Sequence, residues 1–485
     1  MAQGPLICAT VTARTMADLV RARDGVAGAD LVELRLDTVP DPDVDAALKG
    51  RRLPVVVTCR WTAEGGHFKG TEQERRTLLL RALDAGAEFV DIEWQAGLDD
   101  VIRSRHGRNV VLSHHDFAGK SVDLDSRVDA MLATGADVVK VAVMASRLSD
   151  CLPLLELGRR HRGRRIVWLA MGEAGLVTRV FAARFGSCWT YAGDGVAPGQ
   201  MSTAQLTGEL AFRRIGANTR MYGLFGRGIS HSPSPAMHNA GFAELGVDAA
   251  YVPLPAADAD DAMTFARGFD LAGASVTMPF KVDLFGRLDD VDPGAKEIGA
   301  INTLAHTDSR WSGTNTDGPG FLAGVRGVVP RGTRVAILGT GGAARAVAAA
   351  LRDAGAKVTV FGRSADAARN VASALGVSGA ARPVPPSSWD LLVNATPVGT
   401  YPAVEQTSFP ESVFDGGTVY DLVYHPEKTR LLRDAEQAGC RTIGGLTMLI
   451  EQARLQQAWW TGRTPSAAAL HAAAVGKLAT RTEQS

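Results

Sequence analysis

The feature that most constrains this chain is a repeated alternation of short aliphatic runs with amphipathic segments through its first half. Each run is rich in β-branched residues and has the length of a single strand. The eight runs are 6–11, 30–36, 54–60, 88–94, 109–115, 137–143, 165–171 and 187–192. Helical patterns such as 72–86 and 126–135 separate them. Eight strand–helix units predict a (β/α)8 barrel, with residues 201–217 as a closing helix.

The pattern starts again after this barrel. MYGLFG at 221–226 reads as a new strand, and a further segment begins near Gly332 with RVAILGTGGAARAVAAALRDAGAKVTVFGR. Strand, glycine turn, helix and strand in that order are typical of the start of a dinucleotide-binding fold. We therefore expect domain boundaries near Asn218 and Gly327, which divide an α/β chain into three domains.

Composition narrows the class of protein. The 485 residues carry a formal net charge of +0, so neither a nucleic acid nor a membrane surface is an expected partner. The five cysteines are scattered without a C-x-x-C pair, so we expect no disulfide framework, no zinc site and no other metal site, and a reducing cytoplasm. The first residues lack the pattern of a signal peptide, and no stretch reads as a membrane span.

Lys140 lies inside the valine run DVVKVAV. Both faces of a parallel barrel strand are covered, so an inward-facing lysine is buried. Burial disfavours the charged form of an amine, and a neutral amine can attack a ketone to form a Schiff base. The alternative is a lysine near a strand end whose amine reaches solvent.

Candidate partners stand at the ends of neighbouring strands. The preceding strand ends in His114 and His115, and a histidine at the carboxyl end of a barrel strand faces the usual active-site mouth. Its pKa suits proton abstraction, whereas a hydrogen bond to a loop is the alternative role. Glu64 lies in a glycine loop after the earlier strand 54–60 and is placed to orient a histidine. Arginines at several strand ends predict an anionic ligand. They are Arg35, Arg60 and Arg179.

With these motifs, residues 6–217 resemble type I 3-dehydroquinate dehydratase. The matching segments are ADLVELRLD, VTCRWTAEGGHFKGTE, VVLSHHDF, ADVVKVAVM and APGQMS. The resemblance implies that Lys140 forms the Schiff base, that His115 is the general acid and base, and that Glu64 orients it. It also implies a set of substrate-binding residues, namely Thr10, Glu33, Arg35, Arg60, Arg179 and Gln200. The sequence departs from the family pattern at His114, where an aromatic residue is usual, and at Val196, which replaces a serine.

The reaction implied by this resemblance needs no metal or cofactor. Lys140 would condense with the C3 ketone of 3-dehydroquinate, and the protonated imine would make the C2 proton acidic. His115 would remove that proton and then protonate the C1 hydroxyl as it leaves. Hydrolysis of the imine would release 3-dehydroshikimate.

The second half carries two polar patterns of its own. GRGISHSPSPAMHN places Ser232 and Ser234 before a helix, where two hydroxyls can bind a carboxylate, although simple N-capping is the alternative. Lys281 and Asp317 are a candidate pair for moving a proton to or from a substrate hydroxyl. A surface salt bridge is the alternative for that pair.

The glycine turn after Gly332 points to a nucleotide. Gly339, Gly341 and Ala344 occupy the positions of a G-x-G-x-x-A fingerprint between a strand and a helix. Arg363 ends the next strand, where an NAD site would have an acidic residue. An arginine there suits a 2′-phosphate and so favours NADP, with a solvated arginine as the alternative.

Residues 221–485 resemble shikimate dehydrogenase through SHSPSP, SVTMPFK, INTL, NTDG, GTGGAARA, NATPVG, DLVYHP and GGLTMLIEQA. The resemblance implies Lys281 as the catalytic lysine with Asp317 beside it. The implied shikimate-binding residues are Ser232, Ser234, Thr277, Asn302, Tyr424 and Gln452. The implied NADP-binding residues are Gly339, Gly341, Gly342, Ala343, Ala344, Arg363, Ser364, Leu422 and Gly445. The family's second phosphate-binding arginine is Ala367 here, so it is either missing or replaced by Arg369.

The whole chain therefore resembles a fusion of two shikimate-pathway activities, a lyase followed by an NADP-dependent oxidoreductase. The implied domains are a barrel at 1–218, a substrate-binding domain at 219–326 completed by helices at 446–485, and a Rossmann domain at 327–445. The expected partners are small-molecule substrates of chorismate and aromatic amino acid biosynthesis in the cytoplasm, with no obligate protein partner.

Two alternatives stay open. The second half could oxidise quinate with NAD, although Thr277 and the paired serines favour shikimate. The chain could also be a degenerate metabolite sensor, a reading that the presence of Lys140, His115, Lys281 and Asp317 disfavours.

Overall fold

The computed structural model of the chain describes residues 4–119, 123–193, 199–327 and 329–483. The chain divides into two compact units. Unit 1 contains Met1–Arg220 and Asp248–Asp270, and unit 2 contains Met221–Val247 and Leu271–Ser485. Each unit is described by itself.

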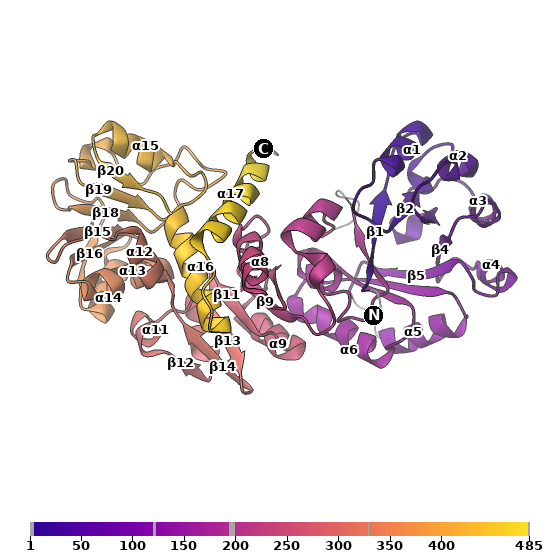
Figure 1. The fold of residues 1–485 in the computed structure, drawn as a ribbon, viewed down its shortest axis with the longest axis horizontal. Helices are drawn as coiled ribbons and strands as arrows, with labels where there is room; N and C mark the ends of the chain where they lie inside the picture. The colour runs from indigo at the N-terminus through magenta and orange to yellow at the C-terminus, as the bar shows by residue number, and fades with distance from the viewer. Residues whose placement is uncertain (1–3, 120–122, 194–198, 328, 484–485) are drawn as a thin grey trace. The chain divides into compact units, whose positions relative to one another are not determined.

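Unit 1 is built on a sheet of eight parallel strands (Figure 1). The strands are β1 (Leu6–Val11), β2 (Leu31–Arg35), β3 (Val55–Thr58), β4 (Phe89–Glu93), β5 (Val110–Asp116), β6 (Val138–Met144), β7 (Ile166–Met171) and β8 (Trp189–Ala192). Their order is β7-β6-β5-β4-β3-β2-β1-β8, and an isolated parallel bridge between Ile166 and Ser187 nearly closes the ring. The eight predicted strands and the barrel are confirmed.

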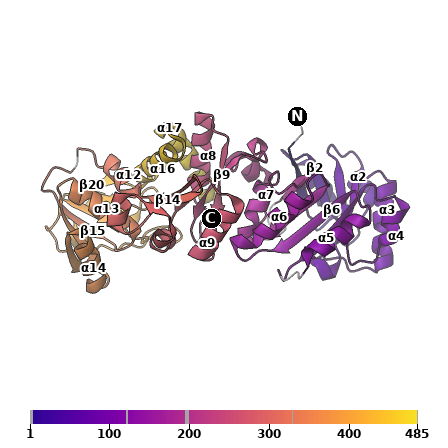
Figure 2. The same ribbon diagram turned by 90° about the horizontal axis from the view of Figure 1, so that it is seen from below.

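Helices follow the strands as a (β/α)8 pattern requires. They are α1 (Met16–Asp24), α2 (Val44–Leu48), α3 (Glu72–Asp84), α4 (Asp99–Ser104), α5 (Leu124–Ala133), α6 (Leu152–Arg160) and α7 (Leu176–Val180). Figure 2 shows α5 and α6 beside β6. The start of α3 is fixed by a capping box, in which Thr71 and Glu74 satisfy each other's free backbone N–H groups.

The single closing helix expected at 201–217 is wrong. The structure has a short π-helical turn at Gln205–Glu209 and a 3-10 turn at Phe212–Arg214. Ala211 between them has φ of +54°, in the left-handed region, which interrupts the repeating hydrogen bonds of an α-helix. Unit 1 also includes β10 (Ala249–Leu254) and α9 (Ala259–Phe269).

Unit 2 contains the strands and helices that follow the barrel in sequence. Its first part comprises β9 (Arg220–Phe225), α8 (Ser234–Leu245), β11 (Gly273–Val276), α10 (Phe280–Asp283), β12 (Asp290–Val291), α11 (Pro293–Ile298), β13 (Thr303–Thr307), β14 (Arg310–Thr314) and α12 (Asp317–Gly324). Strands β9 and β11 are parallel, so the loops after both lie at one edge of their sheet.

The second sheet of unit 2 is wholly parallel, in the order β17-β16-β15-β18-β19-β20. Its elements are β15 (Arg334–Leu338), α13 (Gly342–Asp353), β16 (Lys357–Gly362), α14 (Ala365–Leu375), β17 (Ser378–Ala381), β18 (Leu391–Asn394), β19 (Thr418–Asp421), α15 (Arg430–Gln437) and β20 (Arg441–Ile443). The strand order reverses between β15 and β18, and ligands of such sheets bind at the carboxyl ends beside that switch. The predicted Rossmann fold is confirmed.

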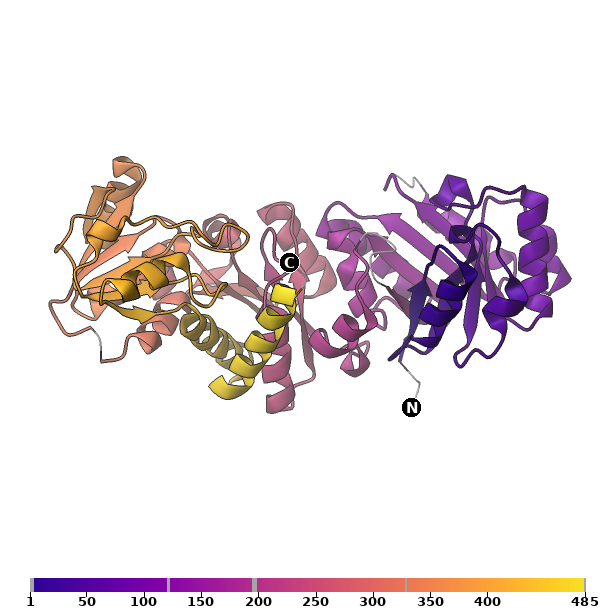
Figure 3. The same ribbon diagram turned by 90° about the horizontal axis from the view of Figure 1, so that it is seen from above.

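The chain ends in α16 (Leu446–Thr461) and α17 (Ala467–Glu483), which Figure 3 shows in yellow. Helix α16 packs against α12 and α17 against α8, so the end of the chain returns to the first part of unit 2. Among the described residues, no helix combines the length and the apolar character that a bilayer span requires.

Candidate active sites

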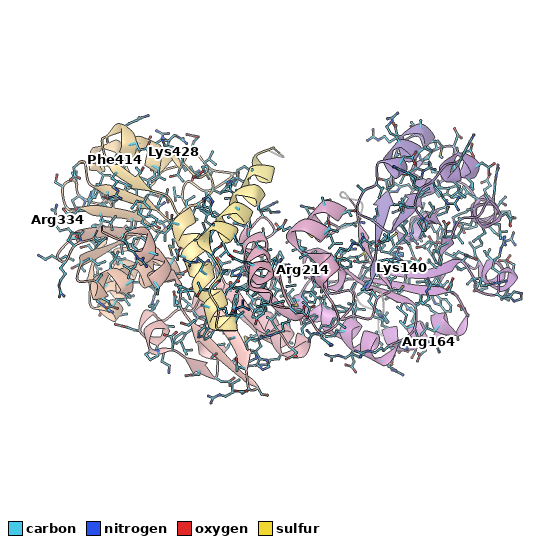
Figure 4. The ribbon with its side chains drawn as sticks, in the orientation of Figure 1. Lys140, Arg164, Arg214, Arg334, Phe414 and Lys428 are labelled. Atoms are coloured by element: carbon cyan, nitrogen blue, oxygen red, sulfur yellow. The ribbon has the colours of Figure 1, made fainter. Side chains whose placement is uncertain are left out.

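The interior of the barrel holds Lys140 on β6, a residue that is only 5% exposed (Figure 4). In the register of β5 and β6, Ser113 pairs with Lys140. Side chains alternate along a strand, so His115 lies on the same face as Ser113, and His114 faces outward. His114 Nε2 instead lies 2.5 Å from Arg127 Nη1. Of the two candidate histidines, His115 is therefore the one beside Lys140.

The Lys140 amine has close partners that the sequence reasoning did not anticipate. Its Nζ lies 3.2 Å from Asp91 Oδ2 and 3.4 Å from Glu33 Oε1, and 4.2 Å from the centre of the Tyr191 ring. Two carboxylates and an aromatic face offset much of the cost of burying an ammonium group. The amine is therefore held by carboxylates on two strands, β2 and β4, and by an aromatic ring on β8.

Arg60 connects these carboxylates into one network. Its Nη1 donates to Asp91 Oδ1 at 2.8 Å, to Glu93 Oε1 at 3.1 Å and to Ser113 Oγ at 2.8 Å. Arg75 Nη1 lies 2.5 Å from the other oxygen of Glu93. Burial alone would raise the pKa of Asp91, but the positive charges of Arg60 and Lys140 hold it well below its usual value. Asp91 is thus an anion fixed beside the amine.

The structure places the carboxylate of Glu64 against His115. The carboxylate oxygen Oε2 of Glu64 lies 2.8 Å from His115 Nδ1 and accepts the backbone N–H of His115 at 3.2 Å. Burial and the charges of Arg60 and Lys140 hold the pKa of His115 well below its usual value. Burial raises the pKa of Glu64 to about 7, against the opposing charge of Arg60. The pair therefore presents a neutral imidazole whose orientation depends on a titrating carboxyl group.

Three of the predicted substrate-binding residues, Thr10, Glu33 and Gln200, are joined by hydrogen bonds. Thr10 Oγ1 donates to Glu33 Oε2 at 3.0 Å, and Thr58 Oγ1 donates to the other oxygen at 2.9 Å. Gln200 Nε2 donates to Thr10 Oγ1 at 3.2 Å. A chain of hydrogen bonds thus runs from Gln200 to the carboxylate that faces Lys140. Val196 lies outside the described residues.

The predicted arginines differ in whether the guanidinium group already has an acidic partner in the protein. Arg35 makes a two-point ion pair with Asp37, with distances of 2.9 and 2.8 Å. Arg179 on α7 is 2% exposed, and its Nε finds no hydrogen-bond acceptor in the described part of the chain. Burial lowers the pKa of Arg179 to about 10. A buried guanidinium with an unused donor is suited to bind an anion that enters from solution.

Sequence reasoning missed six residues of this network. They are Thr58, Arg75, Asp91, Glu93, Ser113 and Tyr191. A signal existed for two of them, because EFVDIEW places acidic residues two apart in a strand, where they share one face. A charged residue inside an aliphatic strand singled out Lys140, and the same contrast marks Asp91 and Glu93.

A second group of polar residues gathers in unit 2 around Lys281 on α10. Lys281 Nζ contacts Asp317 Oδ2 at the start of α12. Asn302 Nδ2 donates to the other oxygen of Asp317 at 2.8 Å and lies 3.5 Å from Gln452 Oε1. Four predicted residues from distant parts of the sequence are therefore adjacent.

The serine loop lies at the same sheet edge. Ser232 Oγ donates to Ser234 Oγ at 3.1 Å, and the Ser234 N–H donates to Ser232 Oγ at 3.2 Å. A Cβ on Gly226, just after β9, would lie 2.4 Å from Thr277 Cγ2, so the loops after β9 and β11 touch. Tyr424 packs against the cluster that joins α8 to α16. The predicted carboxylate-binding serines thus share an edge with Thr277.

The glycine turn after β15 has the shape that a dinucleotide needs. Gly339 has φ of +132°, and a Cβ there would lie 2.8 Å from the carbonyl oxygen of Ala395. Gly341 caps α13 and has open space where a side chain would be, so the helix N-terminus is free to receive a pyrophosphate. A Cβ on Gly342 would lie 3.1 Å from Lys281 Cδ. The start of α13, with Ala343 and Ala344 in its first turn, therefore lies against Lys281.

Two more predicted cofactor residues, Leu422 and Gly445, lie close together on the β18–β19 side of the point where the strand order reverses. A Cβ on Gly445 would lie 2.3 Å from the carbonyl oxygen of Leu422, so glycine permits this close approach. Leu422 follows β19, and Gly445 precedes α16. The two therefore belong to the same carboxyl edge of the sheet.

Arginines follow β16 and β17 at this edge. Arg363 is exposed directly after β16, and Ser364 caps α14. Arg369 Nη2 is 2.5 Å from Asp366 Oδ1. Arg382 directly follows β17, and its backbone N–H donates to the carbonyl oxygen of Gly362 at 3.1 Å. Arg382 thus lies beside Arg363 on the adjacent strand, a neighbour that the sequence did not single out.

Comparison with known proteins covers both units. Residues 7–217 match the family model of type I 3-dehydroquinase. Residues 224–304 match that of the shikimate dehydrogenase substrate binding domain, and residues 445–475 match the shikimate 5′-dehydrogenase C-terminal domain.

Named relatives agree with these models. A bifunctional 3-dehydroquinate dehydratase/shikimate dehydrogenase of Arabidopsis thaliana chloroplasts is 34% identical, over 94% of this chain and 82% of its own. A shikimate dehydrogenase (NADP(+)) of Moorella thermoacetica is 40% identical, over 52% of this chain and 90% of its own. A crystal structure of shikimate dehydrogenase in complex with NADP+ matches with a TM-score of 0.51 and 32% identity, over 54% of this chain and 97% of that one.

Proposed function

Because this chain belongs to the family of bifunctional 3-dehydroquinate dehydratase/shikimate dehydrogenases, we propose that it dehydrates 3-dehydroquinate and then reduces the product to shikimate with NADPH. The observation that carries the first activity is the buried Lys140 amine beside the oriented His115. The second activity rests on Lys281 and Asp317 at the start of a dinucleotide-binding helix.

In the proposed dehydration, Lys140 Nζ attacks C3 of the ketone. The adduct then loses the ketone oxygen as water and becomes a protonated imine. His115 Nε2 removes a C2 proton, and the electrons of that C–H bond move toward the imine. The same imidazole then returns the proton to the C1 hydroxyl, which leaves as water. Arg179 holds the substrate carboxylate, because among the described arginines of the barrel its Nε is the buried donor that lacks an acceptor. Water finally hydrolyses the imine and frees Lys140.

The direct test is a stepwise assay on the full chain. With 3-dehydroquinate alone, absorbance of the conjugated product should appear. Addition of NADPH should then consume one NADPH per molecule of 3-dehydroquinate supplied. If product absorbance appears but NADPH is not oxidised, the second activity is removed from the proposal. If 3-dehydroquinate gives no product absorbance while added 3-dehydroshikimate is reduced with NADPH, the first activity is removed.

The Glu64–His115 pair predicts the pH dependence of dehydration. The pKa of Glu64 is raised to about 7 by burial, so the carboxylate that accepts the His115 Nδ1–H forms as pH rises through that value. The pKa of His115 is lowered by burial, so the imidazole stays neutral across this range. We expect kcat/KM to rise through about pH 7 in the parent, and Glu64→Gln to lose this step with a plateau roughly 100-fold lower. A step near pH 7 that persists in Glu64→Gln would contradict the assignment.

In the proposed reduction, bound NADPH supplies the hydride. The residues of this chain do the rest: Lys281 protonates the oxygen that becomes the new hydroxyl, and Asp317 holds the amine in place. Asn302 fixes the Asp317 carboxylate through its other oxygen. Ser232 and Ser234 bind the substrate carboxylate, with Thr277 and Tyr424 beside them. Thr277 leaves little room for the additional ring hydroxyl of quinate.

We propose that Arg363 and Arg382, rather than Arg369, bind the 2′-phosphate of NADP. Arg369 lies one turn into α14 and is paired with Asp366. Arg382 stands beside Arg363 at the edge where β16 and β17 end, so two guanidinium groups can flank one phosphate.

Dissociation constants measured by nicotinamide fluorescence test this choice. Arg363→Gln and Arg382→Gln should each weaken NADPH binding by about tenfold, because each removes a charge-assisted contact to the phosphate. NADH binding should not change, since NADH lacks that phosphate. Arg369→Gln is the matched control and should leave both constants unchanged. A selective loss of NADPH binding in Arg369→Gln, with none in Arg382→Gln, would reverse the assignment.

Three further features belong to this proposal. The domains are 1–218, 219–326 with 446–485, and 327–445. The enzyme acts on small molecules without an obligate protein partner. Its location is the cytoplasm, which the five free cysteines support, because thiols persist in a reducing compartment.

A further inference from the structure

Outside both proposed sites, three side chains on two barrel helices direct ligand atoms at a common point. Asp125 and Asp129 lie one turn apart on α5, and His161 caps the end of α6. Such spacing puts both carboxylates on one face of the helix. His161 Nε2 lies 3.9 Å from Asp125 Oδ1 and 3.7 Å from Asp129 Oδ1. All three atoms lie within 4.8 Å of one another.

Two of these atoms are buried without a hydrogen bond. The His161 side chain is 10% exposed, and neither its Nε2 nor Asp125 Oδ1 has a hydrogen-bond partner in the part of the chain that is described. Separations of 3.7 and 3.9 Å are too long for hydrogen bonds. Two ligands of one metal ion, each about 2.1 Å from it, lie roughly 3.3 Å apart, so a small contraction would complete the site. An unpaired buried nitrogen is costly, and a cation would remove that cost.

Arg160 supplies the neighbouring positive charge but leaves the ligand atoms free. Its Nη1 contacts Asp125 Oδ2, and its Nη2 lies 3.7 Å from Asp129 Oδ2. The arginine thus faces the second oxygen of each carboxylate, whereas the two Oδ1 atoms face the imidazole. Two carboxylates face a single guanidinium here, and a further cation would balance the second negative charge.

We propose that Asp125, Asp129 and His161 bind one divalent transition metal ion of the Zn²⁺, Co²⁺ or Ni²⁺ class. An imidazole nitrogen among the ligands favours these ions over Ca²⁺ and Mg²⁺, which prefer shells made wholly of oxygen. Helix α5 precedes β6 and α6 follows it, so the ion would link the two helices that bracket the strand of Lys140. The role that follows is stabilisation of the barrel, independent of either proposed reaction.

Cobalt spectroscopy on the full chain tests the site. After chelator treatment, the parent should bind one equivalent of Co²⁺ with visible d–d absorption, and Zn²⁺ should displace it and raise the Tm. His161→Gln and Asp129→Asn should each lower the affinity for Co²⁺ by about 100-fold or more. Even the loss of a hydrogen-bond partner outside the ligand shell lowers metal affinity by roughly 10–100-fold. His471→Gln removes an exposed histidine of α17 and is the matched control, which should bind as the parent does.

Arg160→Gln separates this proposal from a simple ion-pair cluster. Binding should be retained or tightened, because the variant removes a competing cation without removing a ligand. Retained dehydratase activity in each variant would show that the barrel is folded. Absence of a Co²⁺ equivalent in the parent, or an equivalent that His161→Gln leaves intact, would overturn the proposal.

Discussion

Lys140→Met should lower the rate of 3-dehydroquinate dehydration by roughly 10⁵-fold, because loss of a covalent nucleophile removes the whole reaction path and not a single contact. Methionine keeps the length and apolar stem of lysine but cannot form an imine. The parent protein, treated with borohydride in the presence of 3-dehydroquinate, should carry a reduced covalent adduct on Lys140. Peptide mass mapping locates that adduct.

The variant needs a test of folding, since removal of the amine leaves Asp91 and Glu33 without their cation. Reduction of added 3-dehydroshikimate by NADPH on the same chain provides an internal control and should proceed at the parental rate. Lys49→Met, at an exposed lysine after α2, is the matched control for lysine loss in the barrel. Full dehydratase activity in Lys140→Met, or an adduct on another residue, would contradict the proposed chemistry.

The barrel was predictable because parallel strands covered on both faces must be aliphatic throughout. Lys140 stood out against that background for the same physical reason. Asp91 stood out equally in EFVDIEW, yet its importance depends on β4 lying next to β5 and near β6, which the sequence does not display. The choice between His114 and His115 likewise required the register that puts Ser113 opposite Lys140.

Other features depended on contacts between distant segments. Arg60 reads as a substrate ligand from its place at a strand end, but its partners Asp91 and Glu93 become visible only when β3 and β4 are adjacent. The break in the expected closing helix depends on the left-handed backbone at Ala211, which helical periodicity does not reveal. Asp125 and Asp129 lie on α5, whereas His161 lies at the end of α6. The distance in sequence between the two helices follows no motif, so the sequence did not reveal this group.

Lys281→Met should lower kcat for shikimate oxidation by about 10³-fold, the range expected for loss of a positioned acid or base. Lys281 Nζ contacts Asp317 Oδ2, and the start of α13 lies against its side chain, so this amine joins the substrate edge to the nucleotide edge. Binding of NADPH should stay within about twofold, because the phosphate-binding groups are untouched. Stopped-flow single-turnover rates and fluorescence titrations separate the two effects.

Asp317→Asn discriminates between positioning and direct proton transfer. Asparagine keeps the contact with Asn302 but removes the charge that holds the ammonium group. If Asp317 only positions Lys281, the variant should lose less activity than Lys281→Met, and the double variant should lose no more than Lys281→Met alone, because residues of one unit are not additive. Lys357→Met, at an exposed lysine that begins β16, is the matched control. Equal and independent losses in the two single variants would mean that each group acts on the substrate by itself.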